Sequence, residues 1–388
     1  MSIYKKSTTK LFGEIGGRIM LKVLLGRLLS FFHTDSHKYF CISMVGNSYG
    51  CNVKALANYI QEVDPDAIVI WAFSPIMHNQ LQLSNSVIIY SWSYYYHLVS
   101  SRFILSNSRI PLSLFPYKSS KQRYLQMWHG TALKRIEKDA SSSLSGAYKE
   151  LAIADSKKID FFISGSQFMT KIYREAFWYE GSIYEVGTPR NDLFFHDNPD
   201  IICKVRRVFK LAPHEKTVLY APTFRSDYSI ESYNIDVERI VAALQKKWGG
   251  TWRFLIRLHP NLLSCNYYDI IHGRFPDATD ASSYPDMQEL LYSCDILLTD
   301  YSASMFDFMY SRKPCFLYVN DKNSYDRGFY WNINELPFPS FHSNEEIEST
   351  IEQFDNEAYQ CCLTKFLLTI GDKETGHASK SVYELICS

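Results

Sequence analysis

Two histidines directly follow apolar runs of the chain. His129 comes after the run at 124–127 and before Gly130, and His259 comes after the run at 252–258. A neutral histidine can accept a proton from a hydroxyl group as a new bond forms, and a protonated one can stabilise charge on a leaving phosphate. A single histidine in such a place is more often structural, so the pair predicts catalysis only together with the groups around it.

Hydroxyl and guanidinium groups follow other apolar runs in the same way. Arginines bind phosphate through forked hydrogen bonds, and serines at a helix start lie beside free backbone N–H groups and the positive end of the helix dipole. Serine and threonine also act as simple N-caps, so each residue alone is weak evidence. Together they predict one anion-binding cleft, for which the donor-binding candidates are Gly130, Arg190, Thr223, Arg225, Thr299, Asp300, Ser302 and Ser304.

The apolar runs alternate with amphipathic stretches, which is typical of a parallel α/β sheet. Strands are expected at 39–45, 67–73, 160–164, 182–186, 217–220, 252–258, 296–298 and 315–318. A charged stretch near 195–215 lacks a clear strand and separates two halves. We therefore predict two doubly wound, Rossmann-like α/β domains, residues 34–205 and 206–388. Because such sheets bind ligands at the carboxyl ends of their strands, the polar clusters are expected to line the cleft between them.

Composition narrows the classes of function. The 388 residues carry 41 Lys and Arg against 41 Asp and Glu, and 46% are apolar, which indicates a globular chain. The zero net charge argues against a nucleic-acid binder that depends on overall positive potential. The nine cysteines include no Cys-x-x-Cys pair, so neither a zinc site nor a disulfide scaffold is predicted. No Gly-x-x-x-x-Gly-Lys or Gly-x-Gly-x-x-Gly sequence supports an ATPase or a dehydrogenase.

Residues 1–33 differ in character from the rest of the chain. Six basic residues and one acidic residue give them a local charge of +5, and their apolar residues recur at near-helical spacing between Leu11 and Phe32. Such a basic amphipathic helix either docks on the protein's own core or anchors it to an anionic membrane surface. No apolar run reaches the ~18–20 residues that span a bilayer, and no signal-peptide cleavage site follows. We expect a cytoplasmic protein that associates peripherally with the inner face of the cell membrane.

Six separated sequence motifs, in order from about residue 40 to the C-terminus, resemble those of the CDP-glycerol glycerophosphotransferase family, which includes teichoic-acid primases and polymerases and related capsule enzymes. They are Gln-Met-Trp-His-Gly-Thr-Ala-Leu-Lys (126–134), Gly-Thr-Pro-Arg-Asn-Asp (187–192), Leu-Tyr-Ala-Pro-Thr-Phe-Arg (219–225), Arg-Leu-His-Pro (257–260), Leu-Leu-Thr-Asp-Tyr-Ser-Ala-Ser-Met-Phe-Asp-Phe (297–308) and Gly-His-Ala-Ser-Lys-Ser-Val (376–382).

The resemblance implies a GT-B-like fold, with residues 34–205 on the acceptor side and 206–388 binding the donor. It implies transfer of a polyol phosphate from CDP-glycerol or CDP-ribitol to a hydroxyl group of a lipid-linked or polymeric acceptor, with release of CMP. His129 matches the proposed catalytic base and His259 the second active-site histidine, while Thr299, Asp300 and Ser302 match the donor-binding loop. The family commonly has Ser-Ser where this chain has Ser302-Ala303, and Tyr where it has Thr188.

Two other functions stay open at this point. One is a GT-B glycosyltransferase that uses a nucleotide sugar. The other is a non-catalytic, membrane-associated assembly factor with a degenerate transferase fold, against which the retention of His129 and His259 argues. No cofactor is predicted beyond the CDP-polyol substrate, and the need for a divalent metal is left open, as is the choice between glycerol and ribitol.

Overall fold

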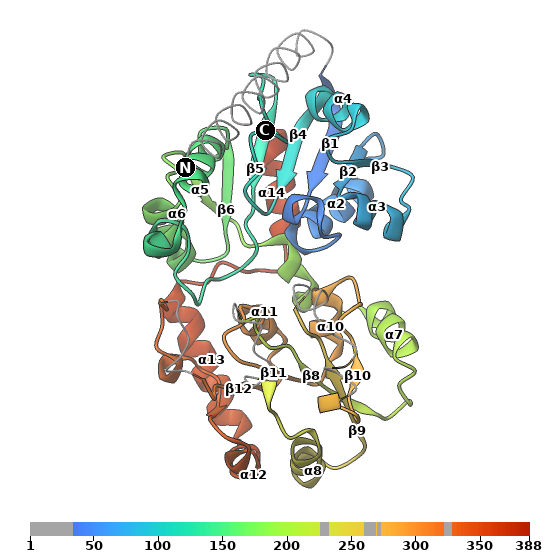
Figure 1. Ribbon diagram of the computed structural model, residues 1–388, viewed down its shortest axis with the longest axis vertical. Helices are drawn as coiled ribbons and strands as arrows, with labels where there is room; N and C mark the ends of the chain where they lie inside the picture. Colours follow the sequence, from blue (N-terminus) through green and yellow to red (C-terminus); the bar gives the residue numbers. More distant parts are fainter. Residues whose placement is uncertain (1–33, 226–232, 260–268, 270–272, 322–327) are drawn as a thin grey trace, which may run out of the picture.

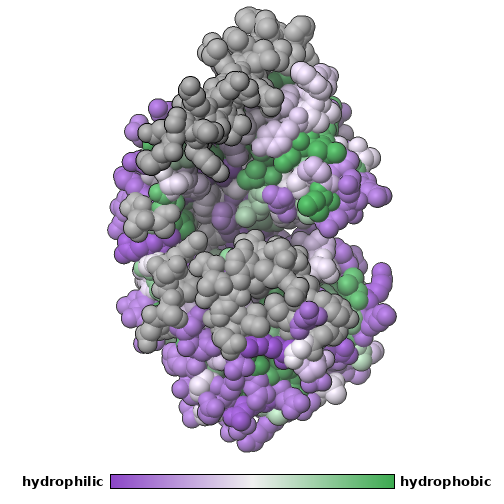
Figure 2. Space-filling view, viewed as in Figure 1, coloured by the Kyte–Doolittle hydropathy of each residue, from purple (hydrophilic) through white to green (hydrophobic). Residues whose placement is uncertain are grey.

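The computed structural model describes residues 34–225, 233–259, 269, 273–321 and 328–388. Two α/β domains meet at a cleft, and Figure 1 shows them one above the other with the first domain at the top. In Figure 2 the surface narrows and is hollowed where the two domains meet, and hydrophobic side chains gather on the upper domain to the right of that hollow. The expected helix at 1–33 lies outside the described residues.

The first domain contains a seven-stranded sheet of order β3-β2-β1-β4-β5-β6-β7, in which every neighbouring pair is parallel. Its strands are β1 (Asp35–Ile42), β2 (Ile68–Phe73), β3 (Ser86–Ile88), β4 (Ser101–Ser106), β5 (Arg123–Gln126), β6 (Phe161–Ser164) and β7 (Ile183–Glu185). The helices between them are α2 (Cys51–Val63), α3 (Pro75–Leu81), α4 (Trp92–Ser100), α5 (Gly146–Ser156) and α6 (Gln167–Ala176).

Side chains of β1 show why this sheet is covered on both faces. Successive residues of a strand point to opposite faces. Tyr39 and Cys41 belong to one buried cluster, and Phe40 and Ile42 belong to another. A strand that is apolar at consecutive positions is typical of a parallel sheet with helices on both sides.

The second domain contains a six-stranded parallel sheet of order β10-β9-β8-β11-β12-β13. Its strands are β8 (Lys216–Tyr220), β9 (Trp252–Ile256), β10 (Thr279–Asp280), β11 (Ile296–Thr299), β12 (Cys315–Tyr318) and β13 (Ser340–Phe341). The helices that follow β7 along the chain are α7 (Pro199–Val208), α8 (Val237–Trp248), α10 (Met287–Ser293), α11 (Ser304–Phe308), α12 (Ile347–Glu352), α13 (Asn356–Ile370) and α14 (Ala378–Cys387).

The chain crosses between the domains twice, and the two crossings are joined. The first crossing is the 3-10 segment η3 (Pro189–Phe195), and the second precedes α14. Asp192 in η3 accepts hydrogen bonds from the backbone N–H groups of Ala378 and Ser379, at 2.8 and 2.7 Å. The carboxylate therefore caps the last helix and fixes it to the first crossing.

Helix α14 packs against the first sheet, although the division expected at residues 205 and 206 assigns it to the second domain. Val382 and Ile386 are buried in the same cluster as Tyr39. Conversely, Val205 in α7 is part of the core of the second domain. A division by sequence position cannot show this return, because the amphipathic pattern of a helix does not tell which sheet it covers.

The predicted α/β fold with two doubly wound domains is confirmed by the two parallel sheets. Strand ends differ from expectation in one informative place: β1 ends at Ile42, and Met44 and Val45 adopt positive φ angles of 47° and 54° in a tight turn. No helix within the described residues is long and apolar enough to cross a membrane.

Candidate active site

A cavity of about 360 Å³ lies between the two domains, where strands of both sheets end. The first domain contributes His129, which follows β5, and Arg190 in η3. The second domain contributes side chains from the segments after β9 and β11, namely Arg257, His259, Ser302, Ser304 and Asp307. The predicted cleft therefore brings together five of the ten expected site residues: His129, His259, Arg190, Ser302 and Ser304.

A strained turn presents His129 to this cavity. Trp128 has a φ of 48°, which L residues rarely adopt, and Gly130 has a φ of 120°. The indole ring of Trp128 stacks on the imidazole of His129, with ring centres 4.3 Å apart. Such strain persists only where surrounding contacts hold it, and it is commonly found at functional sites.

Hydrogen bonding decides the tautomer of His129. Its Nδ1 lies 2.8 Å from the backbone carbonyl of Asn107. A carbonyl can only accept, so Nδ1 carries the hydrogen and Nε2 is left as the basic nitrogen. Burial lowers the pKa of His129 to about 4; the hydrogen bond to Asn107 opposes this shift, and the Arg190 cation adds to it. The imidazole is therefore neutral near pH 7, the state that can accept a proton.

His259 and Arg257 enter the cavity from the second domain, in the extended segment after β9. Residues two apart on an extended segment lie on the same side, and both line the cavity. The Arg257 guanidinium donates a hydrogen bond to the carbonyl of Tyr284 at 2.6 Å. Burial lowers the pKa of His259, and the cations of Lys134 and Arg257 lower it further. Arg257 was missed as a site residue, although its spacing from His259 was a usable signal.

Ser302 and Ser304 line the same cavity, and the Oγ of Ser304 donates to the Oγ of Ser302 at 2.9 Å. The helix that begins there, α11, has only five residues. A helix this short has little dipole, so the expected contribution of a helix dipole to anion binding is small. The two hydroxyls themselves remain as hydrogen-bond partners for a ligand.

Four of the other expected donor-binding residues are not among those that line this cavity, namely Thr223, Arg225, Thr299 and Asp300. The Arg225 guanidinium pairs with Asp321 at 2.7 Å and with Asp300 at 2.9 Å. Asp300 also accepts from the backbone N–H of Thr223, and Thr299 Oγ1 donates to the carbonyl of Ala221 at 2.6 Å. These contacts join the loops after β8 and β11. The sequence motif could not reveal that its charged groups bind one another.

Arg190 is also engaged by the protein itself. Its Nη2 donates to Asp307 in α11 at 2.6 Å, and its Nη1 donates to the carbonyl of His129 at 2.7 Å. A Cβ at Gly130 would lie 2.1 Å from Nη2 of Arg190. The glycine therefore makes room for the guanidinium rather than for a ligand. Arg190 therefore links the turn of His129 to the second domain through Asp307.

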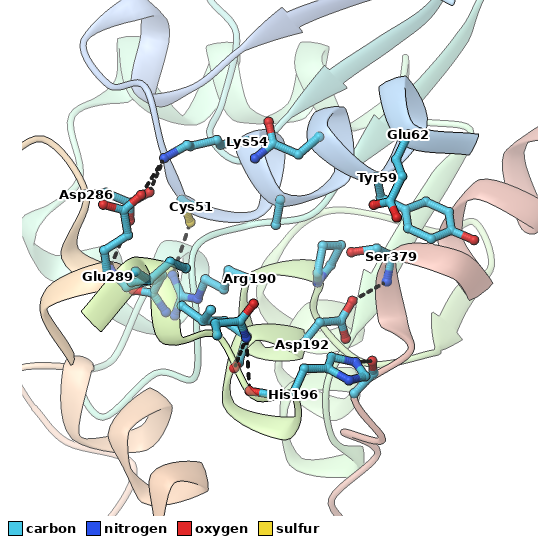
Figure 3. Close-up of a pocket in the computed structure, with 18 of the residues that line it drawn as sticks. Cys51, Lys54, Tyr59, Glu62, Arg190, Asp192, His196, Asp286, Glu289 and Ser379 are labelled. Carbon is cyan, nitrogen blue, oxygen red and sulfur yellow. Dashed lines mark hydrogen bonds and ion pairs between the residues drawn. The ribbon is translucent and has the colours of Figure 1, made fainter. Parts of the chain in front are cut away.

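A second and larger pocket, of about 600 Å³, adjoins this cavity and shares Cys51 and Arg190 with it. Figure 3 shows its walls, with Cys51 and Lys54 on α2, Arg190 and Asp192 on η3, and Glu289 on α10. Lys54 crosses between the domains to Asp286 at 2.6 Å and to Glu289 at 3.2 Å. The pocket is lined by the carboxylates of Glu62, Asp192, Asp286 and Glu289 against Lys54, Arg190 and Lys380, and these charges do not favour a diphosphate.

The described part of the chain offers no candidate metal site. No group of three or more His, Cys, Asp or Glu side chains there has the arrangement that would hold a metal ion.

Comparison with protein families gives one match over most of the chain. The family model described as CDP-Glycerol:Poly(glycerophosphate) glycerophosphotransferase matches residues 25–388. The chain is 30% identical over 361 residues to a teichoic acid poly(glycerol phosphate) polymerase of Staphylococcus epidermidis, covering 89% of this chain and 49% of the relative. It is 31% identical over 362 residues to a teichoic acid glycerol-phosphate transferase of Staphylococcus aureus, covering 89% and 91%. The Bacillus subtilis polymerase is 30% identical over 82% of this chain and 44% of its own length, so the chain spans about half the length of the two polymerases.

Solved structures agree with this match. The wall teichoic acid polymerase TagF superimposes with a TM-score of 0.80 and 28% identity, covering 99% of this chain and 96% of that one. Its structures include variants in which a histidine is replaced, one of them soaked with CDPG. A UDP-N-acetylglucosamine 2-epimerase structure from Listeria monocytogenes, at 10% identity and a TM-score of 0.54, shares the fold alone.

Proposed function

The chain belongs to the CDP-glycerol:poly(glycerophosphate) glycerophosphotransferase family, and we propose that it transfers a polyol phosphate from a CDP-activated donor to a hydroxyl group, releasing CMP. The observation that carries the proposal is the placement of His129 and His259, from different domains, on the wall of one cavity. A cavity with a histidine on each side suits a reaction in which one group accepts a proton and another stabilises a leaving phosphate.

His129 acts on the acceptor. As the acceptor oxygen bonds to the β-phosphorus of the donor, its proton passes to Nε2 of His129, and the bond from that phosphorus to the oxygen of CMP breaks. Burial lowers the pKa of His129 to about 4. A bound diphosphate brings negative charge close to the ring and raises the pKa, which strengthens the base when the donor is in place.

The second domain holds the donor. The polar groups on this wall are the guanidinium of Arg257, the imidazole of His259 and the hydroxyls of Ser302 and Ser304. Phosphoryl transfer depends on positioning and on neutralising charge more than on covalent help, and these groups meet both needs. Arg190 and Arg225 serve the site indirectly, because their guanidiniums are bound to carboxylates of the protein.

The proposal also covers the chemical identity of the donor and of the acceptor. Relatives of this chain are named for glycerol phosphate and for ribitol phosphate, so both CDP-glycerol and CDP-ribitol are candidate donors. The acceptor is a lipid-linked or polymeric chain with a terminal hydroxyl, in the synthesis of a teichoic-acid-like or capsule polymer. The enzyme reaches it from the inner face of the cell membrane, where residues 1–33 supply basic and apolar side chains.

CMP release tests the proposed reaction. The full chain is incubated with CDP-glycerol, CDP-ribitol or a UDP-sugar, each with a polyol-phosphate acceptor, and nucleotide release is measured. We expect CMP from at least one CDP-polyol, a release lowered by about 10²–10⁴-fold with His129→Ala, and normal release with His214→Ala. His214 is an exposed histidine just before β8, at the amino end of that strand and away from the cavity. UDP release from the sugar alone would favour a glycosyltransferase, and no release from any donor would overturn the proposal.

A further inference from the structure

Asn52 is a buried side chain that contacts both the turn of His129 and the backbone of Arg190. It lies in the first turn of α2 and is fully buried. Its Nδ2 donates to the carbonyls of Met127 and Trp128, at 3.2 and 3.0 Å, and its Oδ1 accepts from the backbone N–H of Arg190 at 3.1 Å. No sequence motif that points to the chemistry includes Asn52.

The turn that Asn52 holds is the strained one. Trp128 has its positive φ directly before His129, and an L residue stays in that region only where other contacts outweigh the strain. Besides Asn52, the buried Gln126 accepts from the N–H of Trp128 at 3.0 Å. Two buried amide side chains thus hold the peptide groups on either side of Trp128.

Asn52 is connected to His129 by a second route, which runs through Arg190. Asn52 binds the backbone of Arg190, and the Arg190 guanidinium donates to the carbonyl of His129 at 2.7 Å and to Asp307 at 2.6 Å. Asp307 also accepts from Gln288 at 3.2 Å, so this route is fixed to the second domain. The backbone of His129 is therefore held from α2 through Trp128 and from α11 through Arg190.

We propose that Asn52 is a positioning residue, which sets the direction of the His129 imidazole by holding Trp128 in its strained conformation and Arg190 against the carbonyl of His129. The inference rests on the proposed role of His129 as the base. The site requires asparagine in particular: two carbonyls need a donor and one N–H needs an acceptor, and aspartate would place a carboxylate against both carbonyls. Displacement of a base by about 1 Å is enough to slow a reaction by roughly 10²-fold.

Steady-state kinetics of Asn52→Ala and the isosteric Asn52→Asp test the proposal. We expect kcat for CMP release to fall by about 10²-fold in both, while KM for CDP-glycerol changes less than threefold, because the donor-binding wall is not touched. The matched control is Asn58→Ala, an exposed asparagine on the same helix, which should keep normal kcat. A folded Asn52→Ala variant with normal kcat would overturn the inference.

A double-variant comparison separates positioning from a general loss of structure. If Asn52 acts through His129, then His129→Ala combined with Asn52→Ala is no slower than His129→Ala alone. Independent, additive losses would contradict the proposal. If His129→Ala itself kept activity, the proposed base would be wrong, which is a different result from a silent Asn52 variant.

A milder substitution covers the case in which Asn52→Ala does not fold. Asn52→Ser keeps one small hydroxyl in the buried space and is expected to lower kcat by about tenfold, with a melting transition that remains cooperative. Nitrogen NMR of the His129 ring supplies a second measure: the hydrogen should sit on Nδ1 in the native protein and be shared between Nδ1 and Nε2 in Asn52→Ser. An unchanged ring signal together with normal kcat would overturn the inference.

Discussion

The Nδ1 atom of His129 donates a hydrogen bond to the carbonyl oxygen of Asn107 at 2.8 Å, and this contact leaves Nε2 as the basic nitrogen. Asn107 follows β4, and His129 follows the neighbouring strand β5. The tautomer of the proposed base is therefore set by the adjacency of two strands. Loss of the ring should remove catalysis without loss of the fold.

His129→Ala is expected to lower CMP release by about 10²–10⁴-fold, which is the usual effect of losing a general base. The melting temperature should stay within a few degrees of the native value, because the side chain lines the cavity and is not part of the apolar core. Initial rates and a thermal melt of the same preparation check this. Near-normal turnover would remove His129 from the mechanism.

The low pKa of His129 makes a prediction about stability. Burial lowers the pKa in the folded state from 6.5 to about 4, so between those values the unfolded chain binds the proton more readily. Stability therefore rises with pH across that window and is lost as the pH falls from 6.5 toward 4. Denaturant unfolding of His129→Gln between pH 4 and 7 should show a flatter dependence than the native protein. If the free energy of unfolding changed with pH in the same way in both proteins, the burial of the His129 imidazole would be contradicted.

Gly130→Ala should displace Arg190 from the carbonyl of His129. The added Cβ would lie 2.1 Å from Nη2 of Arg190, at a φ of 120° that disfavours alanine. We expect a destabilisation of about 1–3 kcal/mol and a fall in kcat. Gly146→Ala is a matched control, because nothing lies within 4 Å of its added Cβ and it begins the helix α5. Equal melting temperatures for the two variants would show that Arg190 can move aside freely.

Substitutions of Arg225 and Arg257 are expected to affect different properties, the first the stability of the protein and the second its binding of the donor. Removing Arg225 leaves Asp300 and Asp321 without their buried cation, so Arg225→Ala should cost about 3–5 kcal/mol of stability. Arg257 lines the cavity, so Arg257→Ala should keep the fold and weaken the binding of CDP-glycerol. Calorimetric titration and chemical denaturation of both variants distinguish these effects. A stable Arg225→Ala variant with weak donor binding would restore Arg225 to the pocket.

Deletion of residues 1–33 tests the membrane association. Near an anionic leaflet each basic residue contributes about 1 kcal/mol, and salt screens this attraction. The full chain should sediment with anionic vesicles in a salt-sensitive way, and the truncated chain should not, while its turnover of a soluble acceptor is kept. If the truncated chain still sediments, the exposed Trp92 and Tyr96 on α4 are the next candidates for the anchor.

The positions of polar residues after predicted strands indicated several residues that line the cavity, but not the hydrogen bonds and ion pairs among them. His129 and His259 could be found because each follows an apolar run that forms a strand, β5 of the first sheet or β9 of the second, and the carboxyl ends of both strands face the cavity. Arg225 and Asp300 occur in equally convincing motifs, yet their charges pair with each other and neither residue lines the cavity. Asn52 and Asn107 gave no signal, because they act through backbone groups that become neighbours only on folding.

Helix α14 completes the core of the first domain, although almost all of the second domain precedes it in the chain. During translation the second domain is therefore synthesised before Val382 and Ile386, which complete the buried core of the first domain. Until α14 is synthesised, one face of the first sheet stays partly exposed to solvent, while the elements of the second domain are already present and can fold. The first domain's half of the cleft is thus completed after the second domain, and a change in α14 affects packing beside β1, which lies more than 300 residues earlier in the sequence.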